Sequence, residues 1–392
     1  MNNKKRILIF CYWFGIGGGE RALVDFLKII PKENYDITLM SFNKNFALLE
    51  YIPKYIKIIL PPFKIGMDAS VGIKNLIKKK IKHKQYFIVL SLILGLLFNK
   101  LFMLPFLLKY MLFEKQNVKY DYIFNWSGFS SIGDIICSNV YQSDKKYIWF
   151  HLDFFNDKTM IKKYKKILSK YNFVFCVSKS FSEKVKKVYK NIADKIVTLY
   201  NPIDTEKILN LSNSDSFNDN YNGCRILSVG RLIYLKGFDI AIKACKILID
   251  KGYDFKWYVV GNGPERKKLM NLIKENNLEN NFVLLGEKEN PYPFFKDCDI
   301  YVQTSRSETY CLTLSEAKIL NKPIVTTIFS GTYEQIKDKE TGVVVETTPE
   351  GIAAGVQQLL DNKELREKLI NNLKIENQKP KPDYFSELKK YL

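Results

Sequence analysis

Two glutamates stand eight positions apart in the segment SRSETYCLTLSEAKIL, residues 305–320. The segment follows the apolar run DIYVQT (299–304), which predicts a strand, and a helix is expected to begin near Thr309. Glu308 would then precede the helix and Glu316 would lie about two turns inside it. The first turn of a helix attracts anions, and carboxylates accept hydrogen bonds from the paired hydroxyl groups of sugars. Without a cationic partner nearby, however, ordinary helix glutamates would be the simpler interpretation.

A cationic partner is offered by GRLIYLKG, residues 230–237. Gly230 ends the apolar run RILSV, and Arg231 and Lys236 fall in the loop that follows. Arginine offers a planar fork of donors, lysine offers a point charge, and glycine lets the backbone approach a ligand closely. The run by itself is weak evidence for a ligand site, because two solvated surface cations would give the same sequence pattern. Together with the glutamate segment it predicts a diphosphate site flanked by sugars.

Apolar strands alternate with amphipathic helices through both halves of the chain, which favours two doubly wound α/β domains with parallel sheets. Ligands of such domains bind in the crevice at the carboxyl ends of the strands. The boundary is predicted near residues 200–223, which are rich in Pro, Asn, Ser and Asp. We therefore expect an N-terminal domain at 1–203 and a C-terminal domain at 204–375, with a helix in 376–392 that packs back on the first domain. The expected strands are RILIFCYW, YDITLMSF, KYIKIIL, DYIFNW, YIWF, FVFCVS and IVTLY in the first half, and RILSVG, KWYVVGNG, NFVLLGE, DIYVQTS and KPIVTT in the second.

The formal net charge of +20 resides in the first half of the chain. Residues 1–200 hold 34 Lys and Arg against 14 Asp and Glu, whereas the remaining 192 residues hold 27 of each. Such asymmetry indicates an anionic partner for the first domain, either nucleic acid or a membrane surface. Nucleic acid is disfavoured, because the aromatic residues lie mainly in apolar strands instead of between the basic residues.

Residues 71–113 depart from the α/β pattern. A lysine-rich stretch, VGIKNLIKKKIKHK, precedes the apolar stretch YFIVLSLILGLLFNKLFMLPFLLKYMLF. The uninterrupted apolar part, residues 87–98, would span only about 18 Å as a helix, whereas a bilayer core is about 30 Å thick. A spanning helix is thus disfavoured, and two interpretations stay open. The stretch forms core helices under the first sheet, or it dips into a membrane interface beside the lysines.

Other residue patterns exclude several classes of site. Seven cysteines are scattered singly without CxxC spacing, which suits a reducing cytosol and predicts no zinc ribbon. The N-terminus runs directly into a strand-like stretch without a cleavage site, so no signal peptide is predicted. The pair Asp297 and Asp299 has Asp-x-Asp spacing, but Asp299 opens an apolar strand. We interpret the pair as structural.

The motifs taken together resemble the retaining glycosyltransferases of family 4, which have the GT-B fold of two Rossmann-like domains with an interdomain cleft. The resemblance rests on GRLIYLKG, GNGPE (261–265), LLGE, DIYVQTSRSE and the Glu-x₇-Glu spacing, which occur in that order. It is close over residues 225–345. The segments GIGGGERALVDFL (15–27) and YNPID (200–204) resemble the family's glycine-rich loop and its interdomain crossing.

The resemblance implies a role for each matching position. Arg231 and Lys236 would bind the donor diphosphate, Glu316 the ribose, and Glu308 the transferred sugar. His151, which follows YIWF, would lie near the reacting face of the sugar, and Glu334 is a further acidic candidate. Backbone N–H groups of Thr309, Tyr310, Cys311 and Leu312 would face the phosphates, and the turn containing Gly17 and Gly18 would close on the donor. Where the family often has glycines after the first glutamate, this chain has larger side chains at 309–311, which would narrow the donor pocket.

The implied activity is transfer of a sugar, with retention of configuration, from a UDP-hexose or UDP-N-acetylhexosamine to a glycan or lipid-linked acceptor. No metal or other cofactor is implied, because fixed cations would neutralise the diphosphate. Bacterial capsule, exopolysaccharide or cell-wall synthesis at the cytoplasmic face of the plasma membrane would fit the basic first domain. The alternatives are a sugar-nucleotide epimerase of the same fold and, ranked lower, a basic nucleic-acid-binding protein.

Overall fold

The computed structural model describes residues 4–12, 15, 17–42, 48–62, 81, 86, 116–128, 131–153, 155 and 158–392. It divides into two compact units. Unit 1 comprises Met1–Val177, Val185–Asn201 and Tyr384–Leu392, and unit 2 comprises Ser178–Lys184 and Pro202–Asp383. The expectations for residues 71–113 lie outside the described residues, apart from positions 81 and 86. No helix among the described residues is long and apolar enough to cross a membrane.

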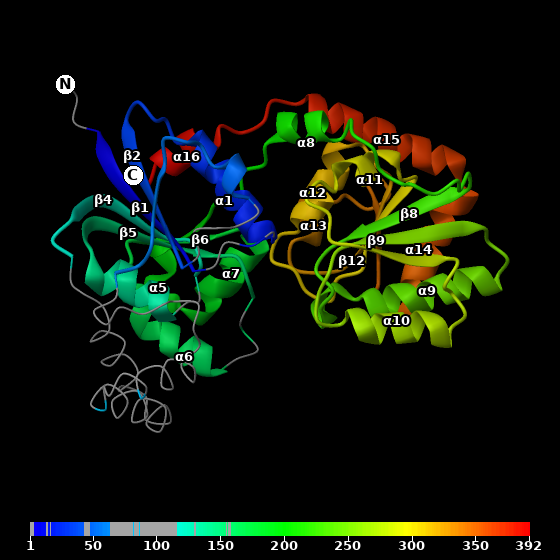
Figure 1. Cartoon of the computed structure of the whole chain (residues 1–392), viewed down its shortest axis with the longest axis horizontal. Coiled ribbons are helices and arrows are strands. Elements are labelled where there is room, and N and C mark those ends of the chain that lie inside the picture. The colour runs from blue at the N-terminus through cyan, green and yellow to red at the C-terminus, as the bar shows by residue number, and fades with distance from the viewer. Residues whose placement is uncertain are drawn as a thin grey trace. The chain divides into compact units, whose positions relative to one another are not determined.

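Unit 1 is built on a seven-stranded parallel sheet in the order β3-β2-β1-β4-β5-β6-β7 (Figure 1). The order reverses between β1 and β4, so the loops after these strands meet at a switch point. The strands are β1 (Lys5–Cys11), β2 (Tyr35–Ser41), β3 (Lys57–Ile59), β4 (Lys119–Asn125), β5 (Gln142–Phe150), β6 (Phe173–Cys176) and β7 (Ile196–Thr198).

Helices of unit 1 cover the sheet with aromatic packing on one face. Phe26 of α1 contacts Phe124, Trp126 and Trp149, with ring centroids 5.0–5.8 Å apart. On the same face, Tyr391 of the C-terminal segment packs against rings of β6. The described helices are α1 (Gly18–Ile29), α5 (Ser131–Ile135) with a π-helical turn (Ile136–Val140), α6 (Lys158–Ile167), α7 (Lys179–Val188), which continues from unit 2, and α16 (Tyr384–Lys389).

Unit 2 has a six-stranded parallel sheet in the order β10-β9-β8-β11-β12-β13, with its switch point between β8 and β11. Its strands are β8 (Cys224–Val229), β9 (Phe255–Val260), β10 (Phe282–Gly286), β11 (Ile300–Gln303), β12 (Ile324–Thr327) and β13 (Val343–Val345). Its helices are α8 (Thr205–Leu211), η6 (Tyr234–Lys236), α9 (Phe238–Asp250), α10 (Arg266–Glu275), α11 (Tyr292–Asp297), α12 (Leu312–Ile319), α13 (Thr332–Gln335), α14 (Pro349–Asp361) and α15 (Lys363–Gln378).

Successive side chains along the strands of unit 2 point alternately into two separate hydrophobic cores, one on each face of the sheet. Ile226 and Trp257 point into one core with α9, α10 and α14, whereas Leu227 and Tyr258 point into the other with α8, α11 and α12 (Figure 1). Because both faces are covered, the strands are continuously apolar. The prediction of two doubly wound parallel sheets is confirmed. All twelve expected strands form, and β13 is an additional edge strand that was not among them.

Candidate active site

The candidate residues of unit 2 lie in loops at the carboxyl edge of its sheet. Residues 230–237 follow β8, and residues 304–311 follow β11, which is the neighbour of β8 at the switch point. Loops after β9 and β12 flank them. Since all these strands are parallel, chemistry-bearing residues 70 or more positions apart in sequence meet at a single edge.

Lys236 and Glu308 meet directly at this edge. Lys236 Nζ lies 2.5 Å from Glu308 Oε1, and the two side chains are only 21% and 14% exposed. Burial alone would lower the pKa of Lys236, but the Glu308 carboxylate outweighs burial and raises it. The lysine is therefore a fixed cation throughout the physiological pH range.

A second ion pair ties the two loops together. Arg306 donates two hydrogen bonds to Asp239, at 2.7 and 2.6 Å, and its guanidinium lies 4.0 Å from the ring centroid of Tyr234. The backbone N–H of Arg306 donates to Leu235 O at 2.8 Å. A bidentate arginine is the most directional ion pair available to a protein, so it holds the loop bearing Glu308 against the turn bearing Lys236. The two residues are 67 positions apart, and the sequence did not predict this pair.

Two glycines allow the loops to pack backbone against backbone. Gly237 has φ +69°, and a Cβ there would lie 2.0 Å from Thr304 O. Gly261 has φ +151°, and a Cβ there would lie 1.9 Å from Gly230 O. These conformations and contacts exclude other residue types. The loops after β8, β9 and β11 therefore depend on glycine for their contact.

Helix α12 begins at Leu312, three residues later than expected near Thr309. Cys311 is the N-cap residue with an extended backbone; its N–H donates to Gln335 Oε1 at 3.0 Å, and its carbonyl accepts from Gln335 Nε2 at 2.9 Å. The Cys311 amide thus already has an acceptor inside the protein. The Thr309 and Cys311 side chains are buried, and Tyr310 is partly buried.

Glu316 is 7% exposed on α12, and Tyr292 OH donates to its Oε1 at 3.4 Å. Burial raises the pKa of the Tyr301 phenol, and the neighbouring Cys311, Glu316 and Glu308 raise it further. Tyr301 is therefore within electrostatic range of both glutamates. The structure brings Lys236, Glu308 and Cys311 into one cluster, with Glu316 at its side.

The remaining predicted residues of unit 2 differ in their surroundings. Arg231 is exposed, and its side chain has no ion pair or hydrogen bond with the described residues. The Glu334 carboxylate accepts the backbone N–H groups of Lys179 and Ser180, at 2.8 and 2.6 Å. Asp299 accepts the N–H of Arg225 at 2.8 Å, and Asp297 accepts the hydroxyl of Ser216. No cluster of potential metal ligands occurs within the described part of the chain.

In unit 1, the predicted residues Gly17, Gly18 and His151 gather at the carboxyl edge of the sheet. Both glycines are exposed at the start of α1, directly after β1. His151 follows β5, and its ring lies 4.8 Å from the ring of Trp126, which follows β4. Trp126 Nε1 donates to Gly19 O at 2.9 Å. Trp126 therefore connects the glycine turn to the histidine.

Burial lowers the pKa of His151 to about 3, although the backbone carbonyl of Trp126 opposes this shift. At neutral pH the imidazole is therefore uncharged in the structure described. An uncharged imidazole can donate or accept a hydrogen bond but brings no positive charge to a ligand.

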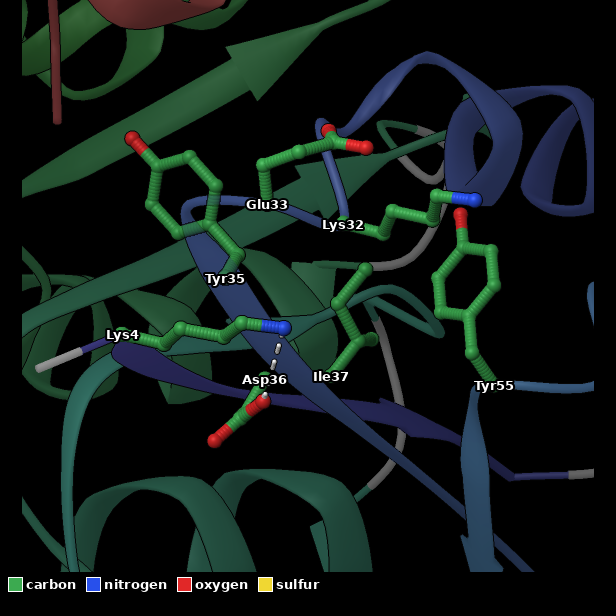
Figure 2. A pocket seen from close by; sticks show the side chains of 7 residues that line it. All are labelled: Lys4, Lys32, Glu33, Tyr35, Asp36, Ile37 and Tyr55. Carbon is green, nitrogen blue, oxygen red and sulfur yellow. Dashed lines mark ion pairs between the residues drawn. The ribbon is translucent and has the colours of Figure 1, made fainter. Parts of the chain in front are cut away.

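A hollow in unit 1 lies at the opposite edge of the sheet. It encloses about 300 Å³ and is lined by Lys4, Lys32, Glu33, Tyr35, Asp36, Ile37 and Tyr55. Figure 2 shows Lys4 approaching Asp36 along one wall. The lining residues lie at the amino end of β2, whereas Gly17 and His151 follow carboxyl ends of strands. This hollow is separate from the candidate site.

Part of the chain is similar to a known protein family. Residues 213–375 match the family model of the glycosyl transferases group 1. These residues form a group 1 glycosyl transferase domain. The group 1 domain holds Arg231, Lys236, Glu308 and Glu316, and the family prediction is confirmed over this part of the chain.

Two relatives each match about half of this chain. An uncharacterised glycosyltransferase of Methanocaldococcus jannaschii is 30% identical over 211 residues, which are 51% of this chain and 54% of the relative. The N-acetylgalactosamine-N,N'-diacetylbacillosaminyl-diphospho-undecaprenol 4-alpha-N-acetylgalactosaminyltransferase of Campylobacter jejuni is 33% identical over 183 residues, which are 46% and 48%. The chain thus matches about half the length of each relative.

Solved structures cover the whole chain and confirm the GT-B fold. A Staphylococcus aureus TarM mutant in complex with fondaparinux, alpha-GlcNAc-glycerol and UDP has a TM-score of 0.72 at 14% identity, covering 99% of both chains. Anabaena HepE in complex with UDP-glucose has a TM-score of 0.68 at 15% identity, covering 98% of this chain and 99% of that one. At these identities the likeness concerns the fold.

Proposed function

We propose that the protein is a retaining glycosyltransferase that takes a hexose or N-acetylhexosamine from a UDP-linked donor. The observation that carries the proposal is the Lys236–Glu308 pair at the switch point of a group 1 domain. In this proposal Lys236 and the exposed Arg231 bind the diphosphate, Glu308 contacts the transferred sugar, and Glu316 holds the ribose. UDP and UDP-glucose in the related solved structures support a uridine donor.

The proposed chemistry is mainly electrostatic. Negative charge grows on the leaving diphosphate as the sugar bond breaks, so fixed cations stabilise the transition state more than the ground state. The N–H groups of Leu312 and Thr313 at the first turn of α12 add to this stabilisation. The leaving phosphate takes the acceptor proton on the same face of the sugar, and no residue of the protein has to act as a nucleophile. The proposed contacts of Gly17, Gly18 and His151 with the donor rest on the family resemblance of their segments.

A thermal-shift screen of nucleotides and nucleotide sugars tests the donor. We expect UDP and one UDP-sugar to raise the unfolding temperature, whereas the matching guanosine and adenosine compounds do not, because a bound ligand stabilises the folded state by mass action. Product analysis with the stabilising donor then separates the alternatives. Donor turnover without an acceptor would instead indicate an epimerase, and absence of any nucleotide-dependent shift would contradict the proposal.

The acceptor is proposed to be a glycan or a lipid-linked sugar used in bacterial surface polysaccharide synthesis, with the protein peripheral on the cytoplasmic face of the plasma membrane. The excess positive charge of residues 1–200 supports an anionic surface as a partner of unit 1. The Campylobacter relative is named for an undecaprenol diphosphate acceptor, and a further relative, the poly(ribitol-phosphate) alpha-N-acetylglucosaminyltransferase of Staphylococcus aureus, is named for a poly(ribitol-phosphate). Both names agree with an anionic acceptor.

Helix α6 supplies a basic face for this contact within the described residues. It follows the His151 loop, and Lys158, Lys165 and Lys166 are exposed on it, whereas Tyr164 and Ile167 are buried. Leu152, in the loop before the helix, is 68% exposed. Lysines near anionic lipid contribute about 1 kcal/mol each, so the three together predict a contribution of about 3 kcal/mol to membrane binding.

Vesicle flotation tests the membrane contact with a charge-matched control. The triple variant K158Q/K165Q/K166Q is expected to lose about 10²-fold in partitioning to phosphatidylglycerol vesicles. K363Q/K368Q/K374Q removes the same charge from exposed positions of α15 in unit 2 and is expected to bind like the wild type. Equal losses in the two variants would show that only net charge matters. Loss of RNA binding in place of vesicle binding would favour the nucleic-acid alternative.

A further inference from the structure

A chain of buried hydrogen bonds runs from the core of unit 2 to Glu308. Tyr301, Gln303 and Ser305 are 0%, 3% and 0% exposed, and they alternate along β11 and its loop. Tyr301 OH lies 2.5 Å from Gln303 Oε1, Gln303 Nε2 lies 2.6 Å from Ser305 Oγ, and Ser305 Oγ lies 2.7 Å from Glu308 Oε1. Tyr301, Gln303 and Ser305 have no role in the chemistry proposed above.

The direction of every hydrogen bond in this chain is set by the donors available. Gln303 Oε1 accepts from Tyr301 OH and, at 3.0 Å, from Thr313 Oγ1, so the Gln303 amide nitrogen must point to Ser305. An amide nitrogen only donates, and Ser305 Oγ therefore accepts from it. The single hydroxyl hydrogen of Ser305 is then directed to Glu308.

Cys311 extends the chain from its other side. Its sulfur lies 3.2 Å from Thr313 Oγ1. Since the Thr313 hydrogen is directed to Gln303, the thiol is the donor in this contact. Burial raises the pKa of Cys311 to about 12, so the thiol keeps its hydrogen at neutral pH. This gives a reason for the side chain at a position where a glycine was expected from the family resemblance.

The consequence at Glu308 is that its two oxygens differ. Oε1 accepts from both Ser305 and Lys236, whereas Oε2 has no hydrogen-bond partner within the part of the chain that is described. A carboxylate oxygen with free lone pairs can accept a hydroxyl hydrogen of a ligand. The carboxylate is thus turned so that one oxygen serves the lysine and the other remains for a sugar.

We propose that Gln303 and Ser305 are positioning residues that fix the Glu308 carboxylate with Oε2 presented to a hydroxyl group of the donor sugar. The proposal rests on the proposed use of a nucleotide-sugar donor. The chain of hydrogen bonds from Tyr301 through Gln303 and Ser305 to Glu308 is called the relay. It then sets the affinity for the sugar part of the donor, whereas Lys236 and Arg231 set the affinity for the nucleotide diphosphate.

Binding of UDP and of UDP-sugars to two variants tests the relay. Ser305→Ala removes the donor to Glu308, and Gln303→Glu keeps the shape of residue 303 but removes the donor to Ser305. The probe is whichever of UDP-glucose, UDP-galactose and UDP-N-acetylglucosamine binds the wild type most tightly. In Ser305→Ala we expect the affinity for UDP to stay within about twofold of wild type. The probe should bind about tenfold more weakly, because the variant loses the effect of one hydrogen bond to a charged group. Gln303→Glu should shift the same ratio in the same direction.

Ser228→Ala is the matched control. Ser228 is 2% exposed on β8, donates to Val302 O at 2.6 Å and accepts from Trp257 Nε1 at 3.0 Å, so its loss also removes two buried hydrogen bonds. A merely structural role of Ser305 would weaken UDP and the UDP-sugar equally in both serine variants, and this result would overturn the proposal. A wild type that binds the sugars no differently from UDP would also overturn it. A wild type that binds no UDP at all would instead refute the proposed function.

Discussion

Replacing Lys236 with alanine is expected to lower turnover by about 10²-fold or more, the size of the loss when one preorganised electrostatic donor is removed from an active site. The Lys236 ammonium is held 2.5 Å from Glu308 Oε1, and its side chain is only 21% exposed. It is therefore already in place before charge develops on the leaving diphosphate. Initial rates at saturating donor measure the effect on turnover.

The variant also removes an ion pair, so a control must separate chemistry from stability. Lys256, at the amino end of β9, pairs with Asp219 at 3.4 Å with 28% of its side chain exposed. Lys256→Ala should leave turnover within about twofold of wild type, because Lys256 lies at the opposite edge of the sheet from the candidate site. Near wild-type turnover in Lys236→Ala, or equal losses in both variants, would remove Lys236 from the catalytic site.

The apolar runs that identified the fold involve residues adjacent in sequence, and for this reason they could be recognised from the sequence alone. Each buried strand of a parallel sheet needs a continuous apolar run, and β8 and β9 show one. The loops that carry chemistry follow such runs directly, so Arg231, Lys236 and Glu308 could be placed at a sheet edge from sequence. The edge strand β13 was not predicted although Val343–Val345 is an apolar run, and its length is not the reason, because β3 is equally short and was predicted.

The contacts that complete the site could not be predicted from the sequence, because the two residues of each contact are distant along the chain. Arg306 and Asp239 are 67 positions apart and meet only because β8 and β11 are neighbours. Gln335 accepts the N–H of Cys311, the N-cap residue of α12, from 24 positions away. Spacing rules within a helix or a strand contain no information on such pairs.

The role of Gly237 also depends on a distant partner. The sequence predicted that glycine in residues 230–237 lets the backbone approach a ligand, whereas the atom that Gly237 approaches is Thr304 O, after β11. Thr304 also donates its hydroxyl to Lys236 O at 2.8 Å. The glycine therefore controls the spacing between the turn that bears Lys236 and the loop that bears Glu308.

Gly237→Ala is expected to destabilise unit 2 by about 3 kcal/mol or more and to abolish measurable turnover. An alanine at φ +69° is strained, and its Cβ would lie 2.0 Å from Thr304 O, so the two loops must separate.

Gly252→Ala is the control that isolates the cost of backbone strain, because Gly252 has φ +86° with no atom within 4 Å of the added Cβ. It should cost about 1 kcal/mol and leave turnover unchanged. Urea unfolding and initial rates of both variants test this comparison. Equal stability losses with turnover retained in Gly237→Ala would mean that the Lys236–Glu308 geometry does not depend on contact between these loops.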